Sequence, residues 1–538
     1  MRRAALLLIA LACAPSCSKA PPRPNLLLVT LDTTRVEALG CYTKRPGVTP
    51  RLDELARESL VFDRARSVAP LTLPAHSSIM TGLYPPRHLV RDNGLAPLPA
   101  SARTAAEELA DAGYQTAAFV SAAVLDHSWG IAQGFERFDD PPQAVAGGVH
   151  LEERDGRETT QHALDWLAQR RKDEPFFAWV HLFEPHAPYA PPPEFLAQAH
   201  GDAYLGEVAA ADHEVGRILD ALRASGALEN TLVIVTADHG ESLGQHGEPT
   251  HSIFCYEATI HVPLLVRLPG GKRAGERSGA TVSLVDLMPT LLAAAGASPL
   301  TGLDGRDLFG AEAPADRSVY FESYCGWLNY AWSPICGAAR GDEKYIWSGT
   351  EELYDLAGDR AEKTNLAGSR PADCAAWRAR VAALVAGKPL VREHVEQADA
   401  AQRARVEQLG YAGAGEATLA IPAPLVSTGL PAPSERKPEL AAYYAALEAE
   451  VAGKHDEAIA GLRALLAQNP RNYSAGDILG ALLVAQGKHE EALKVLESLQ
   501  LTGRERASTH LSLAQCCEAL GRLDQARKHR ERAAELQR

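Results

Sequence analysis

Residues Thr231–His251, with the sequence T-L-V-I-V-T-A-D-H-G-E-S-L-G-Q-H-G-E-P-T-H, determine how the rest of the chain is interpreted. The first six are mostly apolar β-formers, and Asp238 and His239 follow just after them. His251 comes twelve residues after His239. A short buried strand that ends in an acid and an imidazole is typical of a metal site at the carboxyl edge of a parallel sheet.

A second strand of this kind lies near the start of the chain. Residues 25–31, N-L-L-L-V-T-L, lead into Asp32, which precedes Asp238 by 206 residues. Because the carboxyl ends of parallel strands share one edge of a sheet, we expect Asp32 to lie beside Asp238 and His239.

The chain alternates between strand-like and helical segments over residues 24–300. This alternation predicts an α/β fold with a doubly wound, mostly parallel sheet. Residues 301–370 are expected to form a small antiparallel C-terminal subdomain, and residues 371–437 a helix over 375–410 followed by a linker. The strands expected are 25–31, 115–120, 176–182, 231–236, 262–267, 318–321, 344–347 and 352–354, and the helices include 101–112 and 208–225.

Residues 438–538 carry an internal repeat. Glycines recur every 34 residues, at Gly453, Gly487 and Gly521, and an alanine follows each after five residues, at Ala458, Ala492 and Ala526. This period predicts an all-α tetratricopeptide-repeat domain. Such a domain binds a protein or peptide on its concave surface, or else serves only as a cap packed on the preceding domain.

Length and charge limit the possible functions. The 538 residues are 46% apolar and 23% charged, which predicts two or three globular domains. A net charge of −14 argues against a nucleic-acid partner.

The N-terminus has the pattern of an export signal. Residues 1–17 join two arginines to an apolar stretch too short to span a bilayer. We expect an exported lipoprotein of the periplasm or cell envelope, lipidated at Cys17 or Cys13 and held at the membrane only by that anchor; plain secretion is the alternative. Among the other seven cysteines, Cys325 and Cys336 are the nearest candidates for a disulfide, and free thiols are the alternative.

Thr72 is the candidate nucleophile. Pro74 suits the first turn of a helix, which places Thr72 at a helix N-terminus, where free N–H groups favour an anionic ester. A threonine hydroxyl is a poor nucleophile at neutral pH, so a divalent metal is needed to activate it. The alternative is that Thr72 only caps the helix.

Several segments together resemble the sulfatase branch of the alkaline phosphatase superfamily. The resemblance extends from residue 25 to about residue 370 and implies a metal-dependent ester hydrolase. It is carried by P-N-L-L-L-V-T-L-D-T-T-R at 24–35, L-G-C-Y at 39–42, P-L-T-L-P-A-H-S-S-I-M-T-G-L-Y-P at 70–85, H-L-F-E-P-H-A-P-Y at 181–189, T-A-D-H-G-E-S-L-G at 236–244, V-P-L-L-V at 262–266, and E-L-Y-D-L at 352–356 with N-L at 365–366.

The resemblance also implies roles for individual residues. Asp32, Asp238 and His239 match metal ligands, and Thr72 matches the nucleophile, which also touches the metal. His186 matches a histidine that contacts the transferred group. His251 lies where relatives place a residue that serves the leaving group or a second metal.

Four differences from the family bear on the chemistry. The C-x-P-S-R or S-x-P-S-R motif, whose first residue becomes formylglycine, is replaced by T-L-P-A-H at 72–76, so no formylglycine is expected. His76 replaces the arginine that steadies the nucleophile, and Thr33 replaces a second acidic ligand. Residues 119–127 replace a segment with a sulfate-binding lysine, although Ser121 or His127 lies nearby.

These features predict a metal-dependent hydrolase of small-molecule or glycan sulfate esters with Thr72 as nucleophile. One alternative is a phosphodiesterase or phosphotransferase that uses the same threonine, as in the phosphoethanolamine transferases that the site also resembles. The other is an inactive envelope scaffold. The metal is Ca, Mg, Zn or Mn; two histidines and a threonine oxygen suit zinc or manganese better.

Overall fold

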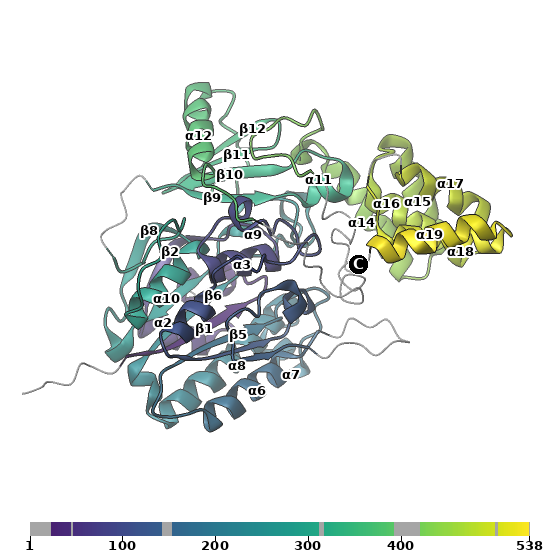
Figure 1. The fold of residues 1–538 in the computed structure, drawn as a ribbon. Coiled ribbons are helices and arrows are strands. Elements are labelled where there is room, and N and C mark those ends of the chain that lie inside the picture. The colour runs from purple at the N-terminus through teal and green to yellow at the C-terminus, as the bar shows by residue number, and fades with distance from the viewer. Residues whose placement is uncertain are drawn as a thin grey trace, which may run out of the picture.

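The computed structural model describes residues 23–44, 47–141, 153–310, 317–391, 420–500 and 504–536. An eight-stranded sheet with helices on both faces forms the largest part, a four-stranded sheet packs beside it, and helices make up the C-terminal part (Figure 1). The export signal and the two candidate lipidation cysteines lie outside the described residues.

The large sheet is mostly parallel, as predicted. Its strand order is β4-β3-β5-β1-β6-β7-β2-β8, and only β7 runs antiparallel to its two neighbours. The strands are β1 (Asn25–Leu31), β2 (Leu60–Arg66), β3 (Gln115–Val120), β4 (Arg137–Asp139), β5 (Phe176–Leu182), β6 (Thr231–Ala237), β7 (Leu264–Arg267) and β8 (Arg277–Ser283).

The sheet is doubly wound because its central strands are apolar on both faces. Along β1, Leu26 and Leu28 pack into the core beneath α3, α5 and α10, whereas Leu27, Val29 and Leu31 pack into the core beneath α2, α6 and α8. Side chains alternate between the two faces of a strand, so an unbroken apolar run requires cover on both.

The helices of the first two parts have the following bounds: α1 (Gly40–Thr43), α2 (Pro50–Arg57), α3 (Thr72–Thr81), α4 (Pro85–His88), α5 (Ala105–Asp111), α6 (Gly156–Gln169), α7 (Pro193–Gln198), α8 (Ala203–Ala224), α9 (Glu257–Ile260), α10 (Leu287–Ala295), α11 (Cys325–Tyr330) and α12 (Pro371–Leu384).

The small sheet is antiparallel throughout, with the order β12-β11-β10-β9. Its strands are β9 (Val319–Ser323), β10 (Ile335–Arg340), β11 (Glu343–Trp347) and β12 (Glu351–Asp355). Helix α12 packs on β9 and β10 and ends at Leu384, earlier than the helix expected over 375–410. Residues 392–419 of the expected helix and linker lie outside the described residues.

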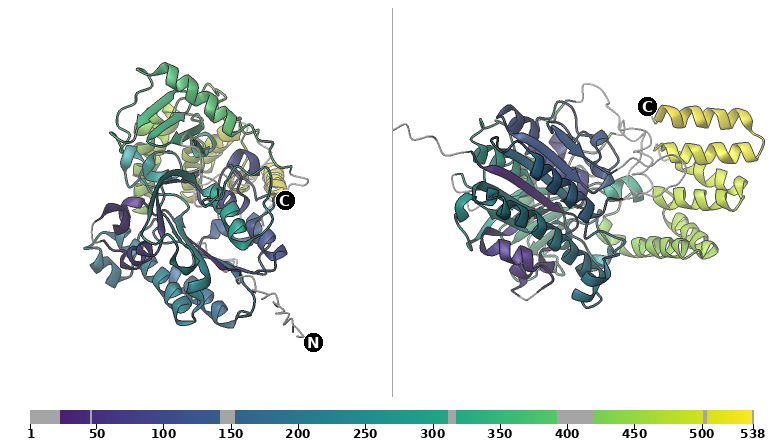
Figure 2. Two further views of the ribbon diagram at one scale, coloured as in Figure 1. Left: turned by 90° about the vertical axis from the view of Figure 1, so that its left-hand side faces the viewer. Right: turned by 90° about the horizontal axis from the view of Figure 1, so that it is seen from below.

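The C-terminal part consists of helix pairs. The helices are α14 (Lys437–Val451), α15 (His455–Gln468), α16 (Tyr473–Ala485), α17 (His489–Gln500), α18 (Ala507–Ala519) and α19 (Leu523–Leu536). Each pair turns at one of the periodic glycines, whose φ angles are +73°, +72° and +73°. Glycine suits these turns because it adopts a left-handed conformation without strain. The pairs are arranged side by side in Figure 2. Their assignment as tetratricopeptide repeats remains a prediction.

Two further sequence expectations concern cysteines and membrane spans. All seven described cysteines are free, including Cys325 and Cys336, so the disulfide considered for that pair does not form. Within the described residues, no helix combines the length and the apolar character needed to cross a bilayer.

Candidate active site

The pairing of two central strands brings the two predicted acids together. Strands β1 and β6 run in parallel, with Leu31 paired to Ala237. Asp32 and Asp238 are the next residues on each strand, so they share the carboxyl edge of the sheet. Both are fully buried.

His239 and Thr72 complete this group. Nε2 of His239 lies 3.6 Å from Oδ1 of Asp32 and 3.5 Å from Oδ2 of Asp238. Thr72 is the first residue of α3, as predicted, and its Oγ1 lies 3.4 Å from the same Nε2. The structure therefore brings all four predicted metal-site residues together.

The donor atoms fit a divalent cation. Both carboxylate oxygens of Asp32 and Oδ2 of Asp238 are buried and have no hydrogen-bond partner among the described residues. One ligand atom each from Asp32, Asp238 and His239 fall within 4.8 Å of one another. Burial and the neighbouring Asp238 raise the pKa of Asp32 well above its usual value. Unpaired buried carboxylates are costly, and a cation among them would remove that cost.

His76 supports the nucleophile from behind. Its Nδ1 donates to the backbone oxygen of Thr72 at 2.8 Å, and its Nε2 lies 3.0 Å from Oγ1 of Thr30. Burial and the nearby His181 lower the pKa of His76 to about 3, so the ring is neutral. Both ring nitrogens of His76 are therefore engaged, one with the backbone of Thr72 and one with Thr30.

His181 is a candidate ligand that sequence reasoning missed. Since Nδ1 of His76 carries the proton, its Nε2 must accept the Thr30 hydroxyl proton. The Thr30 oxygen then accepts from Nε1 of Trp179 at 3.0 Å and from Nδ1 of His181 at 3.1 Å. The lone pair of His181 is therefore on Nε2, which is buried, has no hydrogen-bond partner within the described part of the chain and lies 3.6 Å from Oδ2 of Asp32.

His186 and His251 lie beside the four-residue group. The ring of His251 is centred 4.6 Å from that of His239 and 5.1 Å from that of His186. Nδ1 of His251 contacts Oε1 of Glu241 at 3.2 Å. Burial disfavours the charged ring, but Glu241 outweighs it and raises the pKa of His251 above its usual value. Burial, with the nearby His251, lowers the pKa of His186 to about 3.

The start of α3 offers less to an anion than the sequence suggests. The N–H of Leu73 donates to Oδ1 of Asn93 at 2.9 Å, Pro74 has no N–H, and the N–H of Ala75 donates to the Leu71 oxygen at 3.1 Å. These three positions therefore provide no free donor, so an ester at the start of α3 would meet fewer backbone N–H groups than the sequence suggests.

A cavity of about 410 Å³ opens onto this group. Asp32, Thr72, His186 and His251 line it, whereas His76, Ser121 and His127 do not. Val124 and Glu153 occupy the part of the wall nearest the replaced lysine segment. The further lining residues are Phe183, Ala187, Pro188, Thr250, Ser252, Ile253, Cys325, Tyr330, Tyr443, Tyr444, Leu447 and Ile478.

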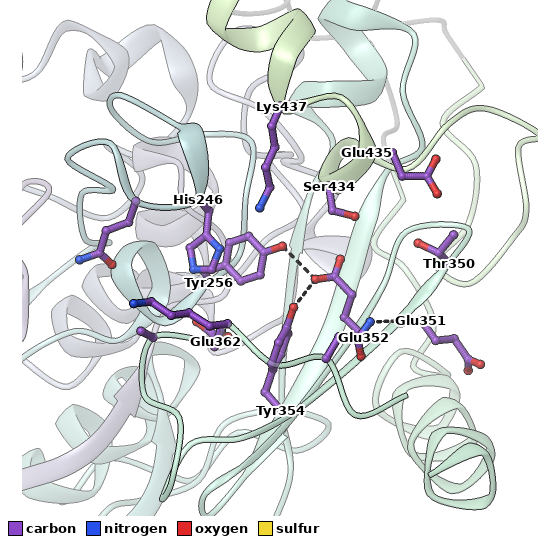
Figure 3. Close-up of a pocket in the computed structure, with 14 residues that line it drawn as sticks. His246, Tyr256, Thr350, Glu351, Glu352, Tyr354, Glu362, Ser434, Glu435 and Lys437 are labelled. Carbon is purple, nitrogen blue, oxygen red and sulfur yellow. Dashed lines mark hydrogen bonds between the residues drawn. The ribbon is translucent and has the colours of Figure 1, made fainter. Parts of the chain in front are cut away.

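A second cavity of about 800 Å³ lies between the small sheet and α14 (Figure 3). Its polar groups satisfy one another: the hydroxyls of Tyr256 and Tyr354 both donate to Oε2 of Glu352, at 2.8 and 2.6 Å. It is larger but contains none of the residues grouped around Asp32, so we assign the chemistry to the smaller cavity.

Comparison with known proteins agrees with this geometry. The family model described as Sulfatase matches residues 24–297, about half of the 538 residues. The chain belongs to the sulfatase family.

The similar proteins include curated sulfatases. The uncharacterized sulfatase YidJ of Escherichia coli is 28% identical over 428 residues, covering 64% of this chain and 83% of that protein. The N-acetylglucosamine-6-O-sulfatase of Bacteroides thetaiotaomicron is 25% identical over 476 residues, covering 66% and 85%.

A solved structure from another hydrolase group shares the fold. The phosphonate monoester hydrolase of Agrobacterium radiobacter superposes with a TM-score of 0.58 at 22% identity, covering 68% of this chain and 96% of that one. At this identity the likeness concerns the fold alone.

Proposed function

We propose that this chain is a metal-dependent sulfuric ester hydrolase in which Thr72 is the nucleophile and no formylglycine forms. The observation that carries the proposal is the position of Thr72: its hydroxyl lines the cavity and lies 3.4 Å from Nε2 of His239, beside the unpaired Asp32 carboxylate. A threonine that only capped the helix would not need its hydroxyl to face the cavity beside these groups.

Asp32, Asp238, His239 and Thr72 would hold the cation, with His181 as a further nitrogen donor. A divalent cation there lowers the pKa of a hydroxyl that it touches and neutralises charge on the ester. Nitrogen donors beside carboxylates favour zinc or manganese over calcium or magnesium.

The residues of the chain then have separate roles. The hydroxyl of Thr72 first loses its proton to solvent; Oγ1 then attacks sulfur, the bond between Oγ1 and sulfur forms, and the bond from sulfur to the alcohol oxygen breaks. His251, whose Nδ1 contacts Glu241, gives a proton to the leaving alcohol oxygen. Neutral His251 then accepts a proton from a water that attacks sulfur, and the bond between Oγ1 and sulfur breaks to return Thr72 to its deprotonated starting form. His186 contacts the transferred group, and His76 holds the backbone of Thr72 in place.

A second candidate function is cleavage or transfer of a phosphodiester by the same threonine. Position 72 holds a threonine and not the cysteine or serine that is converted to formylglycine. This second candidate function is favoured because it uses the threonine hydroxyl directly. The buried oxygens of Asp32 and Oδ2 of Asp238, which have no hydrogen-bond partner among the described residues, argue against an inactive scaffold, since burying them without a cation is costly. We also propose export to the cell envelope and a protein or peptide partner for the C-terminal helices.

Turnover of 4-nitrophenyl sulfate beside bis(4-nitrophenyl) phosphate tests the proposal. The protein is residues 20–538, assayed with and without chelator and as Thr72→Ala and Thr72→Ser. Sulfate cleavage that is sensitive to chelator, absent in Thr72→Ala and partly retained in Thr72→Ser supports the proposal. The same pattern on the phosphodiester alone supports the second candidate, and turnover that survives in Thr72→Ala overturns both.

A further inference from the structure

The cavity that contains Asp32 and Thr72 is closed on one side by the C-terminal helices. Tyr443, Tyr444 and Leu447 come from α14, and Ile478 comes from α16. We call these four side chains the helical wall. They belong to the region where the sequence predicts a separate partner-binding module, yet they line the same space as the proposed nucleophile.

Contacts from α14, α16 and the turn between α15 and α16 fix the helical wall. Oε2 of Glu439 on α14 accepts from Nε1 of Trp332 at 3.3 Å, and Nδ2 of Asn469, at the end of α15, donates to the backbone oxygen of Tyr330 at 2.8 Å. Helix α16 also packs on α11 of the neighbouring part (Figure 1).

One continuous apolar cluster joins the two parts. It contains Ile253 from the loop after His251, Tyr330 from α11 and Leu440 from α14. The rings of Tyr330 and Tyr443 pack edge to face, with centroids 5.3 Å apart. The helical wall is therefore built into the core and is not a surface that happens to lie near the cavity.

Two kinds of side chain line the cavity. Polar ones are Asp32, Thr72, Glu153, His186, Thr250, His251 and Ser252. The helical wall, with Phe183 and Ile253, supplies aromatic and aliphatic ones. Among the described residues, no lysine or arginine lines the cavity.

This distribution selects a class of ester. The sulfate head group would lie at Thr72, which leaves the helical wall, Phe183 and Ile253 as apolar lining for the alcohol half of the ester. Burying an apolar ring there is favourable, whereas the extra anionic groups of a polysulfated saccharide would be buried without a partner. A volume of about 410 Å³ is in the range that holds one compact organic ligand.

We propose that the helical wall is the binding site for the alcohol half of the substrate, and that this half is an aromatic or otherwise apolar group of about the size of one fused ring system. The inference rests on the proposed function, because it takes the cavity around Thr72 to be the ester site. It assigns substrate selection to α14 and α16.

Direct binding tests the inference without turnover. In the Thr72→Ala protein, residues 20–538 loaded with zinc, we measure the Kd of 2-naphthyl sulfate and of methyl sulfate by titration calorimetry. The two probes share the head group and differ only in the alcohol half. The ring should make 2-naphthyl sulfate bind at least about tenfold more tightly than methyl sulfate.

A single substitution should abolish that difference. Leu447 is half-buried on α14, so Leu447→Asp places a carboxylate in the cavity with little strain on the fold. Ala445→Asp puts the same group on the exposed face of the same helix and is the matched control. Leu447→Met keeps the volume and apolar character and should bind like the parent protein.

The expected result is that Leu447→Asp weakens the binding of 2-naphthyl sulfate about tenfold or more and that of methyl sulfate by clearly less, whereas Ala445→Asp and Leu447→Met change neither affinity. Equal affinity for the two probes in the parent protein, no binding of either, or equal effects of Leu447→Asp and Ala445→Asp would overturn the inference. If 2-naphthyl sulfate binds more tightly than methyl sulfate but no turnover depends on Thr72, the helical wall is a binding site for an apolar group and the proposed function is wrong.

Discussion

Thr30 donates its hydroxyl proton to Nε2 of His76 across 3.0 Å, and this contact links the central strand to the helix that carries Thr72. The same oxygen accepts from Trp179 and His181, so one threonine fixes the tautomers of two buried histidines. The lone pair of His181 is directed towards Asp32 as a result.

Thr30→Val should lower both stability and metal affinity. The change keeps the shape but leaves donors on Trp179 and His181 unpaired, which costs about 1–3 kcal/mol of unfolding free energy for each buried group. Loss of a residue that orients a ligand reduces metal affinity about 10- to 100-fold. Urea unfolding and zinc titration measure the two effects. The control is Thr116→Val, at a buried threonine in β3, which should lower stability without changing the affinity for zinc.

Metal removal should reverse the stability order of the parent protein and Asp32→Asn. Without a cation, the Asp32 carboxylate and Oδ2 of Asp238 have no partner among the described residues and Asp238 disfavours the charge on Asp32, so the metal-free Asp32→Asn protein should have the higher melting temperature. With zinc at 100 times its Kd, the unfolding free energy of the parent protein should rise by about 2.7 kcal/mol, and that of the variant by much less. Scanning calorimetry with and without chelator shows the order; an unchanged order would argue against a cation site.

Replacement of the proposed nucleophile should affect the rate far more than the fold. We expect Thr72→Ala to reduce turnover on the order of 10⁴-fold or more, because the loss of a nucleophile is not compensated by its neighbours. The melting temperature should change little, since Thr72 is the first residue of α3 and its side chain faces the cavity. Trapped protein analysed by mass spectrometry should carry a covalent sulfate on Thr72 and on no other residue.

Glu248 should make stability depend on pH. Burial, with a smaller contribution from Glu241, raises the pKa of Glu248 from 4.5 to about 8, and its carboxyl group accepts from the N–H groups of Ile253 and Phe254. A raised pKa means that the folded state prefers the protonated acid. The contribution of Glu248 to the unfolding free energy is therefore complete below pH 4.5 and is lost as the pH rises through 8.

The measurement is urea unfolding of the parent protein and Glu248→Gln from about pH 5 to pH 9. The unfolding free energy of the parent should fall with rising pH, and that of the variant should fall by less. Parallel curves for the two proteins would show that Glu248 ionises normally in the folded state.

Glu439 should hold the C-terminal helices against the small sheet. It accepts from Trp332, and from Nδ2 of Asn469 and Asn472 at 2.7 and 3.1 Å. Glu439→Ala leaves these donors unpaired and should cost about 2–4 kcal/mol of unfolding free energy. Glu448→Ala, on the exposed face of the same helix, should cost little. Urea denaturation compares them; equal losses would assign the docking to other contacts.

The strands that the sequence predicted well are those buried on both faces. Residues 25–31, 115–120 and 176–182 match β1, β3 and β5 residue for residue, since an unbroken apolar run between polar ends is a strong local pattern. Strand β2 contains an aspartate and two arginines, and β10 contains glycine and alanines. These two strands are held by pairing with their neighbours, which the local sequence does not reveal.

The residues of the candidate site also divide into those that the local sequence predicts and those that depend on tertiary packing. Asp32, Asp238 and His239 follow directly after predicted strands, so the parallel register alone brings them together. His181 was missed because it lies inside β5, one residue before the end, where a histidine looks like part of the core. Its position in the quoted segment H-L-F-E-P-H was the available signal. The contact of Leu447 with the cavity depends on how two distant parts pack, and no local pattern encodes it.

The family match ends at residue 297, whereas the helical wall begins at Tyr443. Under the two proposals above, the metal-site residues and the side chains that select the alcohol half come from separate stretches of the chain. Two chains could then agree at every residue of the matched stretch and still differ in substrate, because an exchange of the last hundred residues would exchange one side of the pocket. The family match alone would then carry no information about which ester this chain prefers.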